Sequence, residues 1–346
     1  MKALFLAGGK GVRLQPLTDN LPKPMVQIMN KPLLERTMVN LKRNGITEIV
    51  ISSCYKSRYI EDYFGNGEQL GLKIQYIVED LPLGTGGAIK NTELQFNEPF
   101  IVFNSDILSD INIMSMIEFH KAKKAIASIA VTEVIDPSMY GVIEYDTNDY
   151  AVSFIEKPKP EQISSNFINA GIYIFEPEIL KEIPSNKVVS VERDIFPMIL
   201  EKNLKLAVYK DSSYWMDIGT LEKYIQAHKD ILNRKCNLVD CYPSNTNIRL
   251  GENVKIHPES KIIGPAYIGD NVEIGAKAYI SNSVIGDNTI IGSNSRIIGS
   301  ILWNKIKICN NSRIINTIVT SNCTIRKDSN FLNTVYSQEA NKVISF

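Results

Sequence analysis

The stretch LGENVKIHPESKIIGPAYIGDNVEIGAKAYI, residues 250–280, repeats one pattern every six residues. An apolar residue stands at positions 250, 256, 262, 268, 274 and 280, with polar, turn-forming residues between them. The series slips by one residue and resumes at Ile285 as IGDNTI and IGSNSR. One apolar anchor every six residues is typical of a parallel β-helix, in which each side of a coil contributes one inward side chain. The sequence therefore predicts a β-helix, followed by a short tail, over residues 250–346.

The first two thirds of the chain has a different pattern, in which short apolar runs alternate with amphipathic stretches. The apolar runs predict strands at Ala3–Leu6, Ile49–Ser52, Ile74–Val78 and Phe100–Phe103. The amphipathic stretches predict helices at Pro32–Asn44, Arg58–Phe64, Gly87–Leu94 and Ile113–Lys123. Such alternation indicates an α/β domain with a mainly parallel sheet. Further strands at Ile126–Val134, Val142–Tyr145 and Phe167–Phe175, and a helix at Leu221–Leu232, are expected to extend it.

Two domains are therefore expected, residues 1–235 and 250–346, joined by a connector at 236–249 that contains Pro243 and lacks periodicity. The 346 residues suffice for both domains. The 38 acidic and 38 basic residues balance, which argues against nucleic-acid or anionic-membrane binding. The apolar start is too short for a signal peptide, so a cytoplasmic protein is expected. The five cysteines and three histidines are scattered and suggest neither a zinc site nor a disulfide framework.

The stretch LAGGKGVRLQPLTDNLPKP, residues 6–24, follows the first predicted strand and is rich in glycine. A loop in this position lies at the carboxyl edge of a parallel sheet, where open α/β folds bind ligands. Gly8, Gly9 and Gly11 would let backbone N–H groups approach an anion, and Arg13 and Lys23 add positive charge. The string has neither the Walker ending nor the dinucleotide-binding glycine spacing. The residues alone thus predict an anion-binding loop of another kind.

The longer pattern, Gly-Gly-x-Gly-x-Arg-Leu followed by Pro22-Lys23-Pro24, resembles the signature of the sugar-1-phosphate nucleotidyltransferases, or nucleotide-sugar pyrophosphorylases. Further matching motifs follow in order: PLGTGGAI at 82–89, FNSDIL at 103–108, PSMYGVIEYD at 137–146, FIEKP at 154–158, INAGIYIF at 168–175, SVERDIFP at 190–197 and YWMDIG at 214–219. With the repeats included, the chain is most similar to mannose-1-phosphate guanylyltransferases that carry a hexapeptide-repeat tail. The resemblance implies a Rossmann-like catalytic domain followed by a left-handed β-helix.

The resemblance also implies roles for particular residues. Arg13 would hold the leaving pyrophosphate and Lys23 the α-phosphate, while Asp106 and Asp217 would hold Mg²⁺ and complete the catalytic set. The implied nucleotide-binding residues are Leu6, Ala7, Gly8, Gly9, Gly11, Arg13, Glu79, Gly84 and Thr85. The implied sugar-phosphate-binding residues are Gly141, Glu156, Lys157, Asn169 and Gly171. No general base is required, because a sugar phosphate dianion is already a nucleophile at pH 7.

Substrates and alternatives remain open at this point. Mannose 1-phosphate with GTP is the leading pair, with glucose 1-phosphate and UTP or dTTP, or a heptose 1-phosphate and GTP, as alternatives. A non-catalytic, ligand-sensing subunit of the same architecture would not need Arg13, Lys23, Asp106 and Asp217. An acyltransferase using the β-helix would depend on His257, the only histidine after residue 228. The regular, partly apolar coils of a β-helix need a cap or a partner, and family members with such tails commonly form homo-oligomers, so a homo-oligomer is expected.

Overall fold

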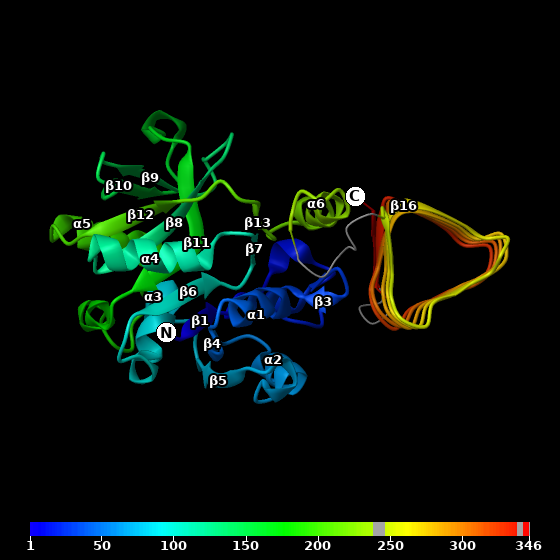
Figure 1. Cartoon of the computed structure of the whole chain (residues 1–346), viewed down its shortest axis with the longest axis horizontal. Coiled ribbons are helices and arrows are strands. Elements are labelled where there is room, and N and C mark those ends of the chain that lie inside the picture. The colour runs from blue at the N-terminus through cyan, green and yellow to red at the C-terminus, as the bar shows by residue number, and fades with distance from the viewer. Residues whose placement is uncertain (238–245, 338–341, 346) are drawn as a thin grey trace. The chain divides into compact units, whose positions relative to one another are not determined.

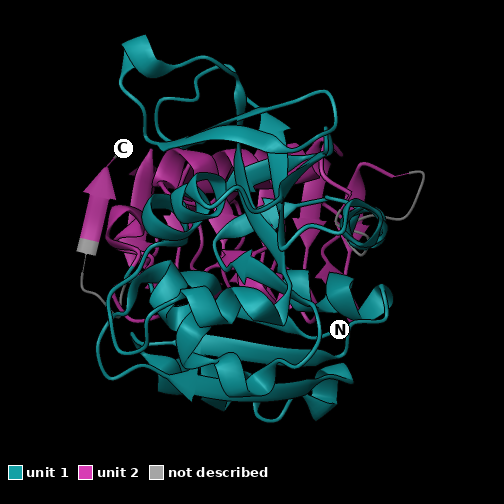
Figure 2. Cartoon of the chain, turned by 90° about the vertical axis from the view of Figure 1, so that its left-hand side faces the viewer, with its two compact units in different colours: residues 1–10, 22–24, 37–217 teal, residues 11–21, 25–36, 218–346 magenta. Residues whose placement is uncertain are grey.

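A computed structural model describes residues 1–237, 246–337 and 342–345. The chain divides into two compact units, shown in separate colours in Figure 2. The first unit contains residues 1–10, 22–24 and 37–217, and the second contains residues 11–21, 25–36 and 218–346. Residues 238–245 of the predicted connector, including Cys241, lie outside the described residues. The predicted domain boundaries at 235 and 250 remain a prediction.

The first unit is built on a nine-stranded sheet, counted over its described residues. Its parallel part has the order β6-β1-β4-β5, formed by β6 (Phe100–Asn104), β1 (Ala3–Leu6), β4 (Glu48–Ser53) and β5 (Lys73–Val78). These are the four strands predicted from apolar runs. Strands β1, β4 and β6 are largely buried, because helices cover the sheet (Figure 1), whereas β5 lies at the end of the strand order and is buried only at Ile74. Their carboxyl ends therefore meet at one edge, where the glycine loop begins.

The later strands extend this sheet beyond β6, mostly in antiparallel fashion. Strand β11 (Phe167–Phe175) pairs antiparallel with β6, with β8 (Ala127–Glu133) and with β9 (Gly141–Tyr145). Strand β10 (Ala151–Glu156) pairs with β9, and β12 (Leu206–Lys210) pairs in parallel with β8. A separate two-stranded ribbon joins β7 (Ile107–Ser109) to β13 (Trp215–Asp217). The prediction of a mainly parallel α/β sheet with later additions is confirmed, and the antiparallel additions make the sheet a mixed one.

The helices largely follow the predicted ranges. They are α1 (Leu33–Arg43), α2 (Ser57–Phe64), α3 (Gly84–Asn91), α4 (Ile113–Lys123), α5 (Phe196–Glu201) and α6 (Leu221–Leu232). The prediction for α3 was wrong by three residues, because the helix begins at Gly84 and not at Gly87. A Cβ atom on Gly84 would lie 2.5 Å from the carbonyl oxygen of Val189, and one on Gly87 would lie 2.7 Å from that of Lys187. The glycines thus allow the helix to pack closely against a neighbouring backbone. Because glycine has a low helix propensity, the sequence did not indicate that the helix includes residues 84–86.

The second unit contains a parallel β-helix, which Figure 1 views along its axis. Successive coils align Leu250, Ile268, Ile285, Leu302 and Val319 on one side, so the first coil has 18 residues and the following ones 17. The slip before Ile285 is therefore repeated in every later coil. The second side consists of β15 (Lys255–Ile256), β17 (Glu273–Ile274), β19 (Ile290–Ile291), β22 (Lys307–Ile308) and β25 (Thr324–Ile325).

The remaining strands form the side that contains Leu250 and a third side. In the first coils the long strands β16 (Lys261–Ile268) and β18 (Tyr279–Ile285) run through both of these sides. The other strands of these sides are β14 (Ile248–Leu250), β20 (Arg296–Ile298), β21 (Ile301–Leu302), β23 (Arg313–Ile315), β24 (Ile318–Val319), β26 (Asn330–Leu332) and β27 (Thr334–Ser337). Strand β28 (Lys342–Ser345) pairs antiparallel with β27. The corners place asparagines such as Asn271 and Asn288 at positive φ, a conformation that asparagine tolerates better than most residues. Hydrogen bonds between stacked asparagines, such as Asn271 to Asn288 at 3.4 Å, connect successive coils.

Inward anchors are buried once a coil lies on each side of them. Ile268 and Ile285 are fully buried, whereas Leu250 and Ile256 of the first coil are 49% and 40% exposed. Within the described residues no earlier coil covers the first one. A six-residue period therefore predicts which side chains point inward, but the burial of each depends on its neighbours along the β-helix axis.

Segment 25–36 and helix α6 belong to the same unit as the β-helix. The segment contains a hairpin of β2 (Gln27–Ile28) and β3 (Lys31–Pro32), with Met29 and Asn30 both at positive φ in its turn. Asn30 donates to the Asp287 carboxylate at 3.1 Å, and Trp303 donates to the Tyr224 hydroxyl of α6 at 2.8 Å. The β-helix is thus hydrogen-bonded to a hairpin that begins four residues after Lys23.

Candidate active site

The loop after β1 leaves its glycine backbone open. The N–H of Ala7 donates to the carbonyl of Ser52 at 2.7 Å, and the Ser105 hydroxyl donates to the carbonyl of Leu6 at 2.6 Å, which fixes the strand end. A Cβ on Gly8 would meet only ordinary contacts, and one on Gly9 would have no atom within 4 Å. Packing within the protein therefore does not require these two glycines. A ligand that approaches the backbone closely would require them, because a side chain would block its approach.

The two predicted metal ligands are neighbours in the structure. Strand β13 pairs with β7 so that Asp217 lies opposite Ile107, the residue immediately after Asp106. The Lys23 ammonium contacts Oδ2 of Asp106 at 2.5 Å. The hydroxyl of Tyr140 donates to Oδ1 of Asp217 at 2.8 Å. Tertiary structure thus joins three of the four predicted catalytic residues at the ends of β6 and β13.

Glu79 holds the chain that leads into α3. Its carboxylate is buried, accepts from the Ser52 hydroxyl at 2.8 Å and accepts from the N–H of Leu83 at 3.0 Å. Gly84 and Thr85 form the first turn of α3, and the Thr85 hydroxyl donates to Glu192 at 2.7 Å. The structure therefore places Glu79 as a support of the α3 start. Its predicted contact with a nucleotide remains a prediction.

The five residues predicted to bind the sugar phosphate come from three neighbouring strands. A Cβ on Gly141 would lie 2.8 Å from Oε2 of Glu156, so β9 and β10 pack closely there. The N–H of Gly171 donates to Oδ1 of Asn169 at 2.8 Å on β11. Burial, reinforced by the Glu192 charge, raises the pKa of Glu156. Lys157 follows β10 with φ of 50°, and its ammonium is 4.0 Å from Glu156.

Gly11 and Arg13 belong to the second unit, in the segment 11–21. Gly11 has φ of 66° and its carbonyl accepts from the Thr18 hydroxyl at 2.8 Å. Arg13 is exposed within a short 3₁₀ turn, Val12–Leu14. Their predicted contact with phosphates remains a prediction.

Sequence reasoning assigned no role to several polar residues that the structure brings into this region. Tyr140 contacts Asp217, Trp215 donates from its indole N–H to the carbonyl of Ala170 at 2.9 Å, and Glu192 contacts Thr85. Oδ1 of Asn104 is buried without a hydrogen-bond partner among the described residues. All of them lie within the recognised motifs, so the motifs contained the signal. Their side-chain partners are distant in sequence and could not be inferred from it.

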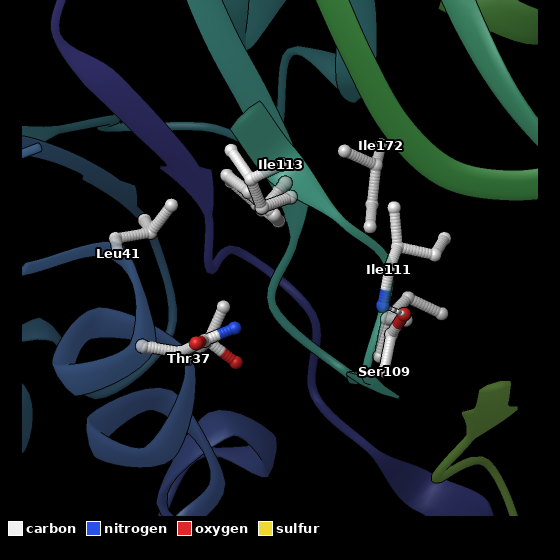
Figure 3. Close-up of a pocket in the computed structure, with 9 residues that line it drawn as sticks. Thr37, Leu41, Ser109, Ile111, Ile113 and Ile172 are labelled. Atoms are coloured by element: carbon white, nitrogen blue, oxygen red, sulfur yellow. Dashed lines mark hydrogen bonds between the residues drawn. The ribbon is translucent and has the colours of Figure 1, made fainter. Parts of the chain in front are cut away.

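Two cavities in the first unit differ in what they could hold. A small cavity of about 10 Å³ lies among Thr37, Leu41, Ile113 and Ile172 (Figure 3), which is room for about one water molecule. It cannot be the substrate site. An open pocket of about 520 Å³ is lined by Thr132, Glu133, Val134, Phe167, Lys210, Asp211, Ser212, Ser213 and Trp215. One of its lining residues, Trp215, donates to the carbonyl of Ala170, which lies between the predicted sugar-phosphate-binding residues Asn169 and Gly171.

The histidines and cysteines show structural environments. Burial lowers the pKa of His228 to about 4, and its Nε2 accepts from the N–H of Met29 at 3.3 Å. Burial also lowers the pKa of His120, which lies 2.8 Å from the Ser128 hydroxyl. His257 is exposed, and no disulfide joins any of the four described cysteines. Over the described ranges, no three His, Cys, Asp or Glu residues form a metal-binding group, and no helix is long and apolar enough to cross a membrane.

Comparison with known proteins agrees with the motifs on which the site is built. Residues 2–234 match the Nucleotidyl transferase family, and residues 245–339 match the EIF2B subunit epsilon LbH domain. The chain belongs to the nucleotidyl transferase family. It is a sugar-1-phosphate nucleotidyltransferase followed by a left-handed β-helix domain, so the two expectations of enzyme class and fold are confirmed.

Its relatives differ in the substrates that their names give. The chain is 34% identical to the mannose-1-phosphate guanylyltransferase of Mycobacterium tuberculosis, over 82% of this chain and 79% of that protein. It is 35% identical to mannose-1-phosphate guanyltransferase beta-A of Xenopus laevis, over 82% and 74%. It is also 33% identical to a UTP–glucose-1-phosphate uridylyltransferase of Synechocystis, over 82% of each. Identity at this level does not separate the two substrate pairs.

Solved structures show a similarity over about two thirds of the chain. HddC from Yersinia pseudotuberculosis, determined in complex with GMP-PN, is 33% identical with a TM-score of 0.58, over 66% of this chain and 99% of that one. A putative glucose-1-phosphate thymidylyltransferase from Bacillus anthracis, in complex with a sucrose, is 26% identical with a TM-score of 0.60, over 66% and 94%.

Proposed function

We propose that this nucleotidyltransferase transfers the guanylyl group of GTP to mannose 1-phosphate, giving GDP-mannose and pyrophosphate. The cluster of Lys23, Asp106 and Asp217 is the observation that carries the proposal, since two polyanions must meet and the catalytic task is mainly charge neutralisation and positioning. The guanylyltransferase names of the Mycobacterium and Xenopus relatives support the choice of substrates.

In the proposed reaction, a phosphate oxygen of the sugar phosphate attacks the α-phosphorus of the nucleotide. The new P–O bond forms as the bond to the bridging oxygen breaks, and pyrophosphate leaves with the electron pair. Gly8, Gly9 and Gly11 would donate N–H groups to the triphosphate, Arg13 would hold the leaving pyrophosphate, and Lys23 would neutralise the α-phosphate. Glu156 and Asn169 would orient the sugar hydroxyls, and Lys157 would meet the sugar phosphate.

The residues present fit a magnesium ion. Carboxylate oxygens are the ligands that Mg²⁺ prefers, and a site with few protein ligands suits an ion that keeps water and substrate oxygens. Asp106 and Asp217 would hold it and, when bound, it would neutralise the phosphates. The 2.5 Å contact of Lys23 with Asp106 supports this, since it brings a positive charge within reach of the proposed metal ligand. Lys23 would then pass from Asp106 to the substrate.

Glucose 1-phosphate with UTP is a second candidate, which the Synechocystis relative supports. Pyrophosphate release should be measured for each of the four nucleoside triphosphates against mannose, glucose and a heptose 1-phosphate. The proposal expects the highest kcat/KM for GTP with mannose 1-phosphate. A higher value for UTP with glucose 1-phosphate would replace it, and no release with any pair would favour a ligand-sensing subunit.

We also propose that the chain forms a homo-oligomer through its β-helix, whose first coil exposes Leu250 and Ile256. Light scattering of the full chain and of Leu250→Asp/Ile256→Asp would test this. A lower mass for the variant is expected, and an unchanged mass above that of one chain would move the interface elsewhere.

A further inference from the structure

Glu192 lies between the start of α3 and the strand that carries Asn169, and neither substrate group includes it. Its Oε2 accepts from the Thr85 hydroxyl at 2.7 Å and from the Ser190 hydroxyl at 2.7 Å. Its Oε1 accepts from the Tyr173 hydroxyl at 3.4 Å. One half-buried carboxylate therefore receives three donors from three separate parts of the first unit.

Two of these three contacts, those with Thr85 and Tyr173, lead to residues of the two substrate groups. Thr85 also accepts from the N–H of Val191 at 2.8 Å, so the α3 start is tied twice to the Glu192 segment. On the other side, the Tyr173 hydroxyl accepts from Nδ2 of Asn169 at 2.8 Å, and Oδ1 of Asn169 accepts from the N–H of Gly171. The result is a continuous chain of hydrogen bonds from Thr85 to Gly171.

The segment that carries Glu192 is itself well fixed. It forms a single π-helical turn, Val191–Ile195, a form that occurs often at functional sites. The Ser190 hydroxyl accepts from the N–H of Arg193 at 3.1 Å, and the N–H of Ser190 donates to Asp194 at 2.7 Å. These two bonds hold the first turn. Glu192 can therefore set the position of its partners.

We propose that Glu192 is a positioning residue that holds Thr85 on the nucleotide side and Asn169 on the sugar side in one geometry. This inference rests on the proposed function, because it takes those two residues as contacts of the two substrates. It adds that the two half-sites are coupled, so that a change at Thr85 is transmitted to sugar-phosphate binding. A carboxylate is suited to this task since both of its oxygens accept and neither donates.

The substitution Glu192→Gln tests this requirement with little change of shape. The amide oxygen can still accept from Thr85 and Ser190, but the amide nitrogen then faces the Tyr173 hydroxyl, which already accepts from Asn169. The fully buried Tyr173 O–H loses its acceptor, and a buried donor without a partner is destabilising. We expect the KM for the sugar phosphate to rise roughly tenfold, and that for the nucleotide to rise less than about threefold.

A pH profile distinguishes positioning from general loss of structure. The charged groups that face Glu156 are Glu192, Lys157 and Arg193, and Glu192 acts to raise the pKa of Glu156. Removing its charge lowers that pKa, so Glu156 stays ionised to lower pH. The acid limb of kcat/KM for the sugar phosphate should move to lower pH in Glu192→Gln. In a variant that was merely less stable, the acid limb would move to higher pH instead, because the protein would lose activity earlier as the pH falls.

Coupling is measured with a double-mutant cycle. Thr85→Val should raise the KM for the sugar phosphate at least about threefold in the wild-type background, and less than about twofold in the Glu192→Gln background, since the connection is already broken there. Thr85→Ser, which keeps the hydroxyl that Glu192 accepts from, should raise the KM for the sugar phosphate less than Thr85→Val does. Equal effects of Thr85→Val on the sugar phosphate in both backgrounds would refute the coupling.

Two further variants complete the test. Glu178→Gln makes the same chemical change at an exposed position of the same unit and should leave both KM values unaltered. If Glu192→Gln does not fold, Tyr173→Phe keeps the carboxylate and removes only the sugar-side contact, so it should raise the KM for the sugar phosphate alone. Wild-type KM values and an unmoved acid limb in the folded Glu192 variant, or wild-type KM values in Tyr173→Phe, would overturn the inference.

The outcome is separable from the fate of the proposed function. All measurements use the nucleotide and sugar phosphate that the wild-type enzyme turns over fastest. If that pair is not GTP with mannose 1-phosphate, the proposed specificity fails, whereas the Glu192 inference fails only if the variants bind the actual pair as the wild type does.

Discussion

Tyr224→Phe isolates the connection between the β-helix and the hairpin that follows Lys23. The Tyr224 hydroxyl accepts from the indole N–H of Trp303 at 2.8 Å and donates to the carbonyl of Gln27 at 2.7 Å. Tyr224 is fully buried and Trp303 is 4% exposed, and burial raises the pKa of Tyr224. The substitution removes one oxygen, keeps the ring and leaves both partners without their hydrogen bond.

The expected loss follows from these two unpaired groups. A buried donor or acceptor left without a partner costs about 1–3 kcal/mol, so two such groups lower the unfolding free energy of the second unit by about 2–6 kcal/mol. The ring still fills its space, and no cavity penalty is added. Tyr76→Phe serves as the matched control, because its hydroxyl donates to the Gly65 carbonyl at 2.7 Å near the surface, where water can replace it. We expect a loss below about 1 kcal/mol there.

The two tryptophans allow each unit to be followed separately. Trp303 belongs to the second unit and Trp215 to the first, and the chain has no others. Urea unfolding would be monitored by fluorescence in a Trp215→Phe background and by circular dichroism in the wild type. For Tyr224→Phe we expect a lower urea concentration at the midpoint of unfolding, with no change in the slope of the unfolding free energy against urea concentration. A loss no larger than that of Tyr76→Phe would show that the paired groups find water or new partners, and would refute the reasoning.

Further predictions concern the metal, Lys23, acid stability and the role of the β-helix. EDTA should abolish turnover, and Asp106→Asn or Asp217→Asn should lower kcat by orders of magnitude while circular dichroism stays unchanged; turnover that persists with EDTA would exclude an obligatory metal. Lys23→Ala should lower kcat more than it raises the KM for GTP, because its charge matters most as the α-phosphate is attacked; an unchanged kcat with a raised KM would contradict that role. The pKa of His228 is lowered from 6.5 to about 4 in the folded protein, so the unfolded chain binds a proton there more readily. The unfolding free energy should therefore fall by about 3 kcal/mol as the pH drops from above 6.5 to 4. His228→Gln should lack this part of the pH dependence in urea titrations. Truncation after residue 235 should expose the hairpin of segment 25–36 and lower the melting temperature, because the deletion removes Asp287 and Trp303; a truncated chain as stable as the full one would show that those contacts contribute nothing.

The sequence determined the elements whose signal is local. Apolar runs such as Phe100–Phe103 predicted buried strands, since a strand covered on both faces needs apolar residues throughout. Ile268, Ile274 and Ile280 predicted the inward side chains of the β-helix, because a coil repeats its geometry at a fixed interval. The ordered motifs predicted the family. In each case the information lies within a few neighbouring residues or in a period.

Tertiary structure alone decided what depends on partners distant in the chain. Helix α3 begins at Gly84, where the carbonyl of Val189, more than a hundred residues away, leaves no room for a side chain and accepts from the N–H of Gly86 in the first turn. The sequence showed only a slip of one residue before Ile285. The pairing of the strands shows that the later coils have 17 residues each. Lys23 meets Asp106, and Glu192 meets Thr85 and Tyr173, across separations that no local pattern encodes. A sequence specifies the types of groups in a site, but hydrogen bonds and burial act through distances that only the folded chain sets.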